Sequence, residues 1–203
     1  MAVKTKICGI TSIEEVEMLN ACLPDYAGFV MFYENSKRNN GIEQVRELLE
    51  GLDERIQRVA VTVSPTPEQM RLLSQMNFQI LQVHGSLSQE AIEACALPIW
   101  RAYHVTDEKE PELEEDEMGK IAGYVLDGAS PGSGKPFAWK ALQSFCRDDK
   151  MLILAGGLCA KNVRAAIDTL SPDVVDVSSG VEGDCGKDAG KIQEFIGKVK
   201  AHE

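Results

Sequence analysis

The sequence predicts a single-domain α/β protein, a (β/α)8 or TIM barrel that comprises residues 1–203. Short β-branched runs alternate with amphipathic segments of helical length along the chain, and we count eight of each. Such alternation is typical of βα units that build a parallel sheet. The length of 203 residues lies near the lower limit for eight units. The pattern G-x-G-x-x-G of open doubly wound sheets is absent, which favours a closed barrel.

Each unit begins with a predicted strand and continues into a predicted helical stretch. The strands are expected at Lys4–Cys8, Ala27–Met31, Arg58–Val63, Ile80–Val83, Ile99–Tyr103, Gly123–Leu126, Leu152–Ala155 and Val174–Val177. Helix signals include a capping box at Ser12–Glu15, Ile42–Gly51 with its terminal glycine, Pro67 in a first turn, Ala160–Leu170 and Lys187–Val199.

The charge balance excludes several classes of partner. The chain has a formal net charge of −11 and no basic patch, so neither nucleic acid nor an acidic membrane surface is an expected partner. An acidic run, Glu108–Asp116, is interpreted as a solvated loop and helix start. No apolar stretch is long enough to span a bilayer, and we expect a cytoplasmic protein.

Cysteine and histidine spacing indicates no metal site. Six cysteines are scattered without a C-x-x-C pair, so neither zinc binding nor a disulfide framework is predicted. Metal-ligand spacing is also lacking among the three histidines, His84, His104 and His202.

Two reactive residues are predicted at strand ends, where barrels place their active sites. Cys8 ends the first strand and Asp127 follows the sixth, and each precedes a glycine. Strand alternation places Lys6 on the same face as Cys8, and Val125 on the same face as Asp127. A thiolate and a carboxylic acid in one pocket can act as base and acid. The structural alternative is that Cys8 is a small buried hydrophobe and Asp127 a cap.

Glycine-rich loops after the seventh and eighth strands predict a phosphate site, because exposed backbone N–H groups bind anions at this place in barrels. The residues expected to hold the phosphate are Gly156, Gly157, Ser179 and Gly180. Taken singly, each loop could be an ordinary tight turn. The segment GASPGSGK at 128–135 lacks the nucleotide P-loop spacing, and is interpreted as a lid or wall beside Asp127 or a plain surface loop.

An interior ion pair is predicted between Lys6 and Asp176. Alternation directs both side chains into the barrel, and the first and eighth strands are neighbours only if the barrel closes. An unpaired buried lysine costs several kcal/mol, so a partner is expected. Alternatively, the Lys6 stem extends to the bottom opening.

These motifs together resemble the phosphoribosylanthranilate isomerase family over nearly the whole chain. The matching segments are KICGIT at 6–11, GFVMFYENSKR at 28–38, LQVHG at 81–85, LDG at 126–128 with GSGKPFAW at 132–139, LAGGL at 154–158 and VDVSSGVEGDCGKD at 175–188. The resemblance implies an Amadori rearrangement in tryptophan biosynthesis, with Asp127 as general acid and Cys8 as general base. It also implies a small phosphorylated substrate, no metal or organic cofactor, and a monomer or homodimer.

Further substrate-binding residues are implied by the same resemblance. Arg38 matches the arginine expected near the anthranilate carboxylate, the alternative being a solvated surface arginine. Gln82 and His84 match positions that line the barrel, and for His84 a satisfied interior histidine is an equal alternative. Asp176 is included among the substrate-binding residues. The chain departs from the family at Lys37 and Ala160, where proline is common.

Two other functions compete with this interpretation. Another phosphosugar barrel isomerase would share the phosphate loops, but such enzymes generally use two carboxylates or a metal. The related histidine-pathway isomerase uses a pair of aspartates, whereas Cys8 ends the first strand here. A non-catalytic barrel that binds a phosphorylated metabolite or a partner protein is the second alternative, and the presence of both Cys8 and Asp127 argues against it.

Overall fold

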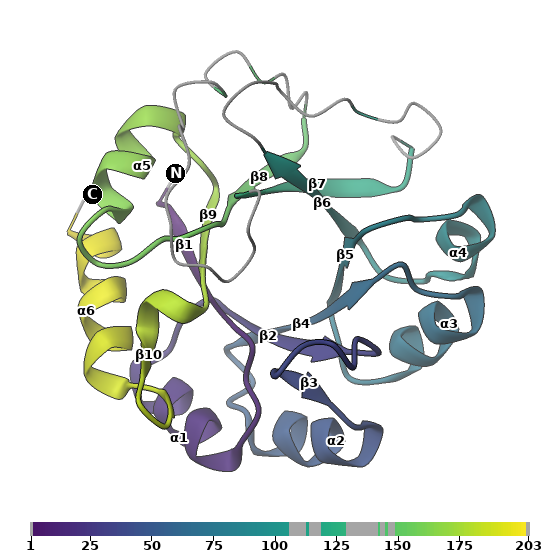
Figure 1. Ribbon diagram of the computed structural model, residues 1–203, viewed down its shortest axis with the longest axis horizontal. Coiled ribbons are helices and arrows are strands. Elements are labelled where there is room, and N and C mark those ends of the chain that lie inside the picture. Colours follow the sequence, from purple (N-terminus) through teal and green to yellow (C-terminus); the bar gives the residue numbers. More distant parts are fainter. Residues whose placement is uncertain are drawn as a thin grey trace.

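Eight parallel strands close into a barrel in the computed structural model, which describes residues 2–105, 113, 119–128, 142, 145 and 149–201 (Figure 1). Strand β1 pairs with both β2 and β9, which closes the ring and confirms the predicted barrel. The barrel strands are β1 Lys4–Cys8, β2 Tyr26–Met31, β4 Gln57–Val63, β5 Ile80–His84, β6 Ile99–Val105, β7 Ile121–Gly128, β8 Met151–Leu154 and β9 Val174–Val177.

Helices surround this barrel on the outside, as Figure 1 shows. They are α1 Ile13–Cys22, α2 Ile42–Gly51, α3 Pro67–Gln75, α4 Gln89–Ala94, α5 Val163–Leu170 and α6 Ala189–Lys200. None of these helices combines the length and apolar character needed to cross a bilayer. Most of the helical stretches expected after β6 and β7, of the acidic run at 108–116 and of the segment 128–135 lies outside the described residues.

The predicted capping box of α1 is only half formed. The Ser12 hydroxyl accepts a hydrogen bond from the Glu15 N–H at 3.3 Å, as expected. The Glu15 carboxylate instead accepts hydrogen bonds from the N–H groups of Thr11, at 2.7 Å, and Lys187, at 2.9 Å. Glu15 therefore joins the first helix to a segment 172 residues later in the chain.

Two predicted helix starts were wrong. Helix α5 begins at Val163 rather than at Ala160, and α6 begins at Ala189 rather than at Lys187. Lys187 belongs to a short hairpin, β10 Glu182–Gly183 with β11 Gly186–Lys187, which follows a 3-10 turn at Ser179–Val181. The side chain of Asp188 accepts a hydrogen bond from the Lys191 N–H and caps α6, which fixes the later start. A two-residue strand, β3 Asn39–Asn40, was also not predicted.

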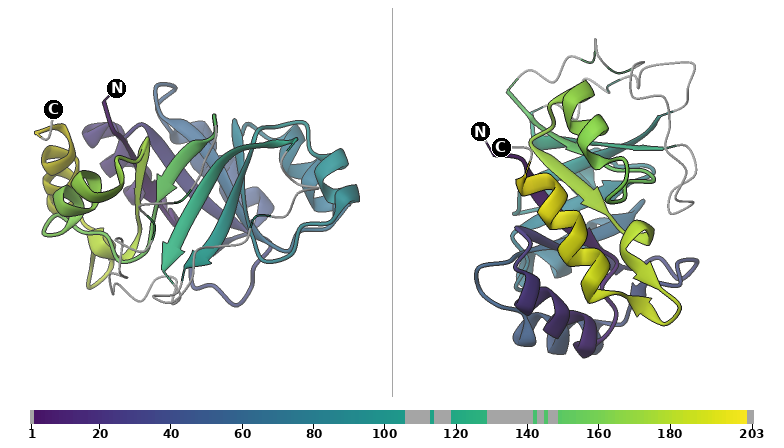
Figure 2. Two further views of the ribbon diagram at one scale, coloured as in Figure 1. Left: turned by 90° about the horizontal axis from the view of Figure 1, so that it is seen from above. Right: turned by 90° about the vertical axis from the view of Figure 1, so that its left-hand side faces the viewer.

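The barrel interior is apolar at one end and polar at the other. Near the N-terminal ends of the strands, Tyr26 and Trp100 meet edge to face with ring centroids 5.1 Å apart. Gly123 leaves space there, since a Cβ would lie 3.0 Å from the Trp100 ring. Figure 2 shows the arrowheads of β6, β7 and β8 at the side of the barrel opposite both termini. The polar interior residues collect toward that side, where Lys6 and Asp176 meet.

The predicted ion pair between Lys6 and Asp176 is confirmed. The two residues are directly paired across β1 and β9, and Nζ lies 2.7 Å from Oδ2. The Lys6 side chain is fully buried and that of Asp176 is 6% exposed. Burial alone would lower the pKa of Lys6, but the charges of Asp176 and Cys8 and the hydrogen bonds with these two side chains together outweigh it and leave that pKa raised. The lysine is therefore charged inside the barrel.

We expect Lys6→Met to reduce the free energy of unfolding by about 3–5 kcal/mol, because it leaves Asp176 charged, buried and unpaired. Adding Asp176→Leu to that variant should recover part of the loss. Urea unfolding of the wild type, both single variants and the double variant gives the coupling energy between the two sites. A coupling energy of zero would show that the pair does not stabilise the closed barrel.

Candidate active site

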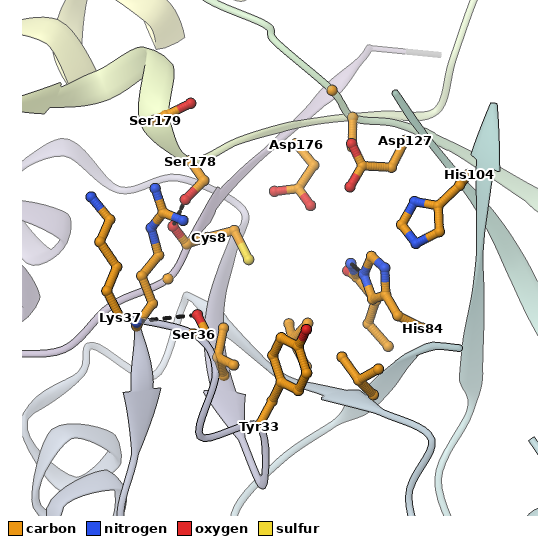
Figure 3. A pocket seen from close by; sticks show the side chains of 18 of the residues that line it. Cys8, Tyr33, Ser36, Lys37, His84, His104, Asp127, Asp176, Ser178 and Ser179 are labelled. Carbon is orange, nitrogen blue, oxygen red and sulfur yellow. Dashed lines mark hydrogen bonds between the residues drawn. The ribbon is translucent and has the colours of Figure 1, made fainter. Parts of the chain in front are cut away.

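A pocket of about 550 Å³ opens at the C-terminal ends of the barrel strands (Figure 3). Almost all the site residues expected from the sequence line it: Cys8, Arg38, Gln82, His84, Asp127, Gly156, Gly157, Asp176 and Ser179. Gly180 is not among the lining residues. It packs against the loop after β8, where a Cβ at this position would lie 1.9 Å from the Leu158 carbonyl oxygen. Gly180 thus allows the two glycine-rich loops to touch.

Cys8 ends β1 and points into the pocket, as Figure 3 shows. The neighbouring residue on β2 is Gly28, and a Cβ there would lie 2.7 Å from the Cys8 sulfur and 3.1 Å from Lys6 Nζ. Gly28 therefore provides the space for both side chains. Burial raises the pKa of the Cys8 thiol, while the positive charges of Lys6 and Lys187 act in the opposite direction.

Asp127 enters the same pocket from β7 and is 9% exposed. Burial, followed by the negative charge of Asp176, raises the pKa of Asp127 to about 7, against opposing contributions from Lys6 and a backbone hydrogen bond of Gly128. Gly156, with φ of +85°, lets the loop after β8 pass beside this carboxyl, since a Cβ would lie 3.0 Å from Oδ1. A substantial fraction of Asp127 is therefore protonated at neutral pH.

Asp176 presents a second carboxylate oxygen to the pocket. Its Oδ2 binds Lys6, whereas Oδ1 is buried and has no hydrogen-bond partner within the described part of the chain. Figure 3 shows Asp176 beside Asp127. An acceptor held in this way can receive a hydrogen bond from a ligand hydroxyl.

Arg38 is held at the pocket edge by Glu182 and is not a solvated surface arginine. Its Nε and Nη2 atoms lie 2.8 Å and 2.6 Å from Glu182 Oε1, and its side chain is 18% exposed. Lys37 and Lys187 also bind the Glu182 carboxylate, at 3.1 Å and 3.2 Å. Burial would raise the pKa of Glu182, but hydrogen bonds from Arg38 and Lys37 and the charge of Lys187 lower it to about 2. The Ser36 hydroxyl accepts a hydrogen bond from the Arg38 N–H, which fixes the loop path that lacks the expected proline.

Two residues of the candidate site were missed by sequence reasoning. Glu182 lies within the segment 175–188 that carries the family resemblance, but its arginine partner is 144 residues away in the sequence. His104 lines the pocket next to His84, with ring centroids 5.6 Å apart, although the two lie on different strands. The register of the barrel strands could have indicated the contact between His84 and His104, whereas the contact between Arg38 and Glu182 joins segments outside the barrel strands.

His84 both lines the pocket and is hydrogen-bonded within the barrel. Its Nε2 atom lies 2.9 Å from the amide nitrogen of Gln82, which is 2% exposed. Burial, together with the charges of Lys6 and Arg101 and the proximity of His104, lowers the pKa of His84 to about 3. The imidazole is therefore neutral at physiological pH.

The loop after β8 turns through two glycines and is fixed by an asparagine. Gly156 and Gly157 have φ values of +85° and +68°, in the left-handed region that favours glycine. Asn162 donates a hydrogen bond to the Gly157 carbonyl at 2.9 Å and accepts one from the Cys159 N–H at 2.8 Å. These bonds hold the turn although alanine occupies position 160.

A comparison with protein families decides among the alternatives. The family described as N-(5'-phosphoribosyl)anthranilate (PRA) isomerase matches residues 5–198. The chain belongs to this family. Membership of the phosphoribosylanthranilate isomerase family confirms the fold and the class of enzyme predicted from the sequence. It argues against the two alternatives, a different phosphosugar isomerase and a non-catalytic barrel.

Individual phosphoribosylanthranilate isomerases match nearly the full chain. The N-(5'-phosphoribosyl)anthranilate isomerase of Thermoanaerobacter pseudethanolicus is 37% identical, with 98% of both chains covered. The solved isomerase of Thermotoga maritima is 33% identical at a TM-score of 0.83, covering 98% of this chain and 99% of that one. Another solved member of the family, 32% identical at a TM-score of 0.80 over 98% and 99% of the two chains, is in complex with reduced 1-(o-carboxyphenylamino)-1-deoxyribulose 5-phosphate.

Replacing the buried carboxyl at position 127 should stabilise the protein. Because the folded-state pKa of Asp127 is about 7 and its usual value is 3.8, ionisation costs stability as pH rises between these values. We expect Asp127→Asn to raise the free energy of unfolding by about 2–4 kcal/mol at pH 8 and by little near pH 3. Urea unfolding at both pH values measures the difference. Equal effects at the two pH values would contradict the raised pKa.

Proposed function

We propose that the chain converts N-(5-phosphoribosyl)anthranilate to 1-(2-carboxyphenylamino)-1-deoxyribulose 5-phosphate in tryptophan biosynthesis, with Asp127 as general acid and Cys8 as general base. The main support for this proposal is that the side chains of Cys8, on β1, and Asp127, on β7, line the same pocket. The solved family member with a bound reduced aminoketose phosphate supports the choice of substrate.

Asp127 is suited to start the reaction. The ribose ring oxygen needs a proton as its bond to C1 breaks, and the lone pair of the anthranilate nitrogen forms the Schiff base. A carboxyl whose pKa is raised to about 7 is partly protonated at neutral pH, while an ordinary exposed aspartate would not be. Burial thus supplies the protonation state that the first step requires.

Cys8 is suited to complete the rearrangement. The thiolate removes the proton from C2, the C–H electron pair forms the enamine, and the iminium nitrogen accepts the displaced electron pair. The enol then becomes the ketone as the hydroxyl on C2 loses its proton and C1 gains one. Burial favours the neutral thiol and leaves the pKa of Cys8 raised overall, while the ammonium groups of Lys6 and Lys187 favour the thiolate and limit that rise. The substrate nitrogen serves as the electron acceptor, and the route needs no organic cofactor.

The remaining pocket residues position the two ends of the substrate. The phosphate is placed against the backbone of Gly156, Gly157, Ser179 and Gly180, where the loops after β8 and β9 meet. Arg38 receives the anthranilate carboxylate, which competes with Glu182 for the guanidinium. The free oxygen of Asp176 accepts a hydrogen bond from a sugar hydroxyl, and the neutral side chains of Gln82 and His84 form the opposite wall.

A cytoplasmic location and a monomeric or homodimeric state are further parts of this proposal. They follow from the expected place of the reaction in biosynthesis and from the family. One solved relative, from Thermotoga maritima, is described as a dimeric isomerase from which monomers were generated.

We expect Cys8→Ser and Asp127→Asn each to reduce turnover by about 10²- to 10⁴-fold while the fold is retained, because each removes one proton-transfer group. Consumption of fluorescent phosphoribosylanthranilate measures turnover, and circular dichroism measures folding. Cys22→Ser is the matched control, since Cys22 is a free cysteine that does not line the pocket. Near-normal turnover in both folded variants would refute the assignment.

If backbone N–H groups bind the phosphate, Lys187→Ala should leave the phosphate affinity nearly unchanged. The Lys187 ammonium is occupied by Ser178 and Glu182, at 3.1 Å from the Ser178 carbonyl oxygen and 3.2 Å from the Glu182 carboxylate. Calorimetry with inorganic phosphate should show affinities within about 3-fold of each other for wild type and Lys187→Ala, a difference worth less than one kcal/mol.

Gly180→Ala should instead weaken phosphate binding, because the new Cβ would lie 1.9 Å from the Leu158 carbonyl oxygen and separate the two loops. Gly197→Ala is the matched control, as nothing lies within 4 Å of a Cβ at that position in α6. Circular dichroism shows which variants remain folded. If Lys187→Ala weakened phosphate binding as much as Gly180→Ala, the backbone site would be refuted.

A further inference from the structure

Three neighbouring strands bring metal-binding side chains together at one side of the pocket. His84 ends β5, His104 lies near the end of β6, and Asp127 lies near the end of β7. His104 and Asp127 are directly paired across β6 and β7. One possible ligand atom from each of the three residues lies within 4.8 Å of the other two. Figure 3 shows the two rings and the carboxyl facing a common space.

This donor set matches the preferences of late divalent transition metals. Two imidazoles and one carboxylate form a common three-ligand set for Zn²⁺, with a fourth position left for water or a ligand. Both imidazoles line the same pocket as the Asp127 carboxyl. The nearby Lys6 charge is balanced by its ion pair with Asp176.

Small side-chain rotations would bring the three groups to coordination distance. Zinc–ligand bonds of about 2.0–2.2 Å in a tetrahedron place ligand atoms about 3.3 Å apart. A pair separated by 4.8 Å must therefore approach by about 1.5 Å. His104 is exposed, so its ring can turn toward the other two without disturbing the core.

Gln82 provides a second, independent observation. Its amide nitrogen lies 2.9 Å from His84 Nε2, while its buried Oε1 has no hydrogen-bond partner among the described residues. Rotation of this amide by 180° would let Oε1 accept a hydrogen bond from a protonated Nε2 and leave the other ring nitrogen as the lone-pair donor. Metal-bound histidines characteristically donate their second ring N–H to such a carbonyl oxygen.

We propose that His84, His104 and Asp127 bind a late divalent transition metal, with Zn²⁺ as the representative ion, and that the bound metal inhibits the isomerase. A metal coordinated by the Asp127 carboxyl would occupy the group that is proposed to protonate the ring oxygen. The inhibition rests on the proposed role of Asp127 as general acid, whereas the binding does not. The spacing of the histidines in the sequence gave no indication of this site, because its three residues come from three strands.

Metal binding is measured directly on the full chain after dialysis against a chelator and then against metal-free buffer. Calorimetry with ZnCl₂ should show one site per chain, and Co²⁺ should give the absorption bands of a coordinated ion. His104→Ala and Asp127→Asn should each raise the Zn²⁺ Kd by at least about 10-fold. His202→Ala is the matched control, because it removes the third histidine of the chain and should leave the Kd unchanged.

Cys8→Ser tests whether Zn²⁺ binds to the Cys8 thiol instead of the proposed site. If Cys8→Ser raised the Kd and His104→Ala did not, or if no Zn²⁺ bound to the wild type, the proposed site would be overturned while the isomerase mechanism stood. In the fluorescence assay, Zn²⁺ should inhibit the wild type reversibly, with recovery on adding chelator, and His104→Ala should lose this sensitivity. Binding that requires His104 but leaves turnover unchanged would overturn the inhibition, whereas the role of Asp127 as acid is tested separately by the turnover of Asp127→Asn.

Discussion

The ion pair between Lys6 and Asp176 is the constraint on which the rest of the structure depends. The two residues occupy the first and last barrel strands, so their contact at 2.7 Å exists only when the ring is closed. Inside an apolar barrel each charge requires the other, because an isolated buried ion would cost several kcal/mol. The pair therefore links closure of the fold to the presence of fixed charges beneath the pocket.

Those fixed charges act differently on the two reactive groups above them. Lys6 favours the thiolate of Cys8, whereas Asp176 raises the pKa of Asp127 and so favours its neutral form. One ion pair thereby pushes the Cys8 thiol and the Asp127 carboxyl toward opposite protonation states. Gly28 makes this arrangement possible sterically, since any side chain at that position would occupy the space of Cys8 and Lys6.

The barrel and the positions of Cys8 and Asp127 in its pocket could largely be predicted from the sequence. All eight predicted strands are present, because short β-branched runs between helices leave few alternatives, and Cys8, Asp127 and the Lys6–Asp176 pair follow from strand alternation once closure is assumed. Contacts between distant loops could not be predicted. The Glu182 carboxylate that binds Arg38 lies 144 residues further along the chain. Lys187 was predicted to lie in a helix but belongs to a hairpin, and the Glu15 carboxylate that binds this hairpin lies 172 residues earlier in the sequence. Local periodicity contains no information on such pairs.

The central claim is that the closed, charged barrel keeps Asp127 protonated near neutral pH. A carbon-13 NMR titration of the aspartate carboxyl signals, with the Asp127 resonance identified by its loss in Asp127→Asn, tests this claim most directly. The account predicts a midpoint at about 7 for Asp127. A midpoint near the usual value of 3.8 would contradict it, because Asp127 would then be ionised at neutral pH and unable to protonate the ring oxygen.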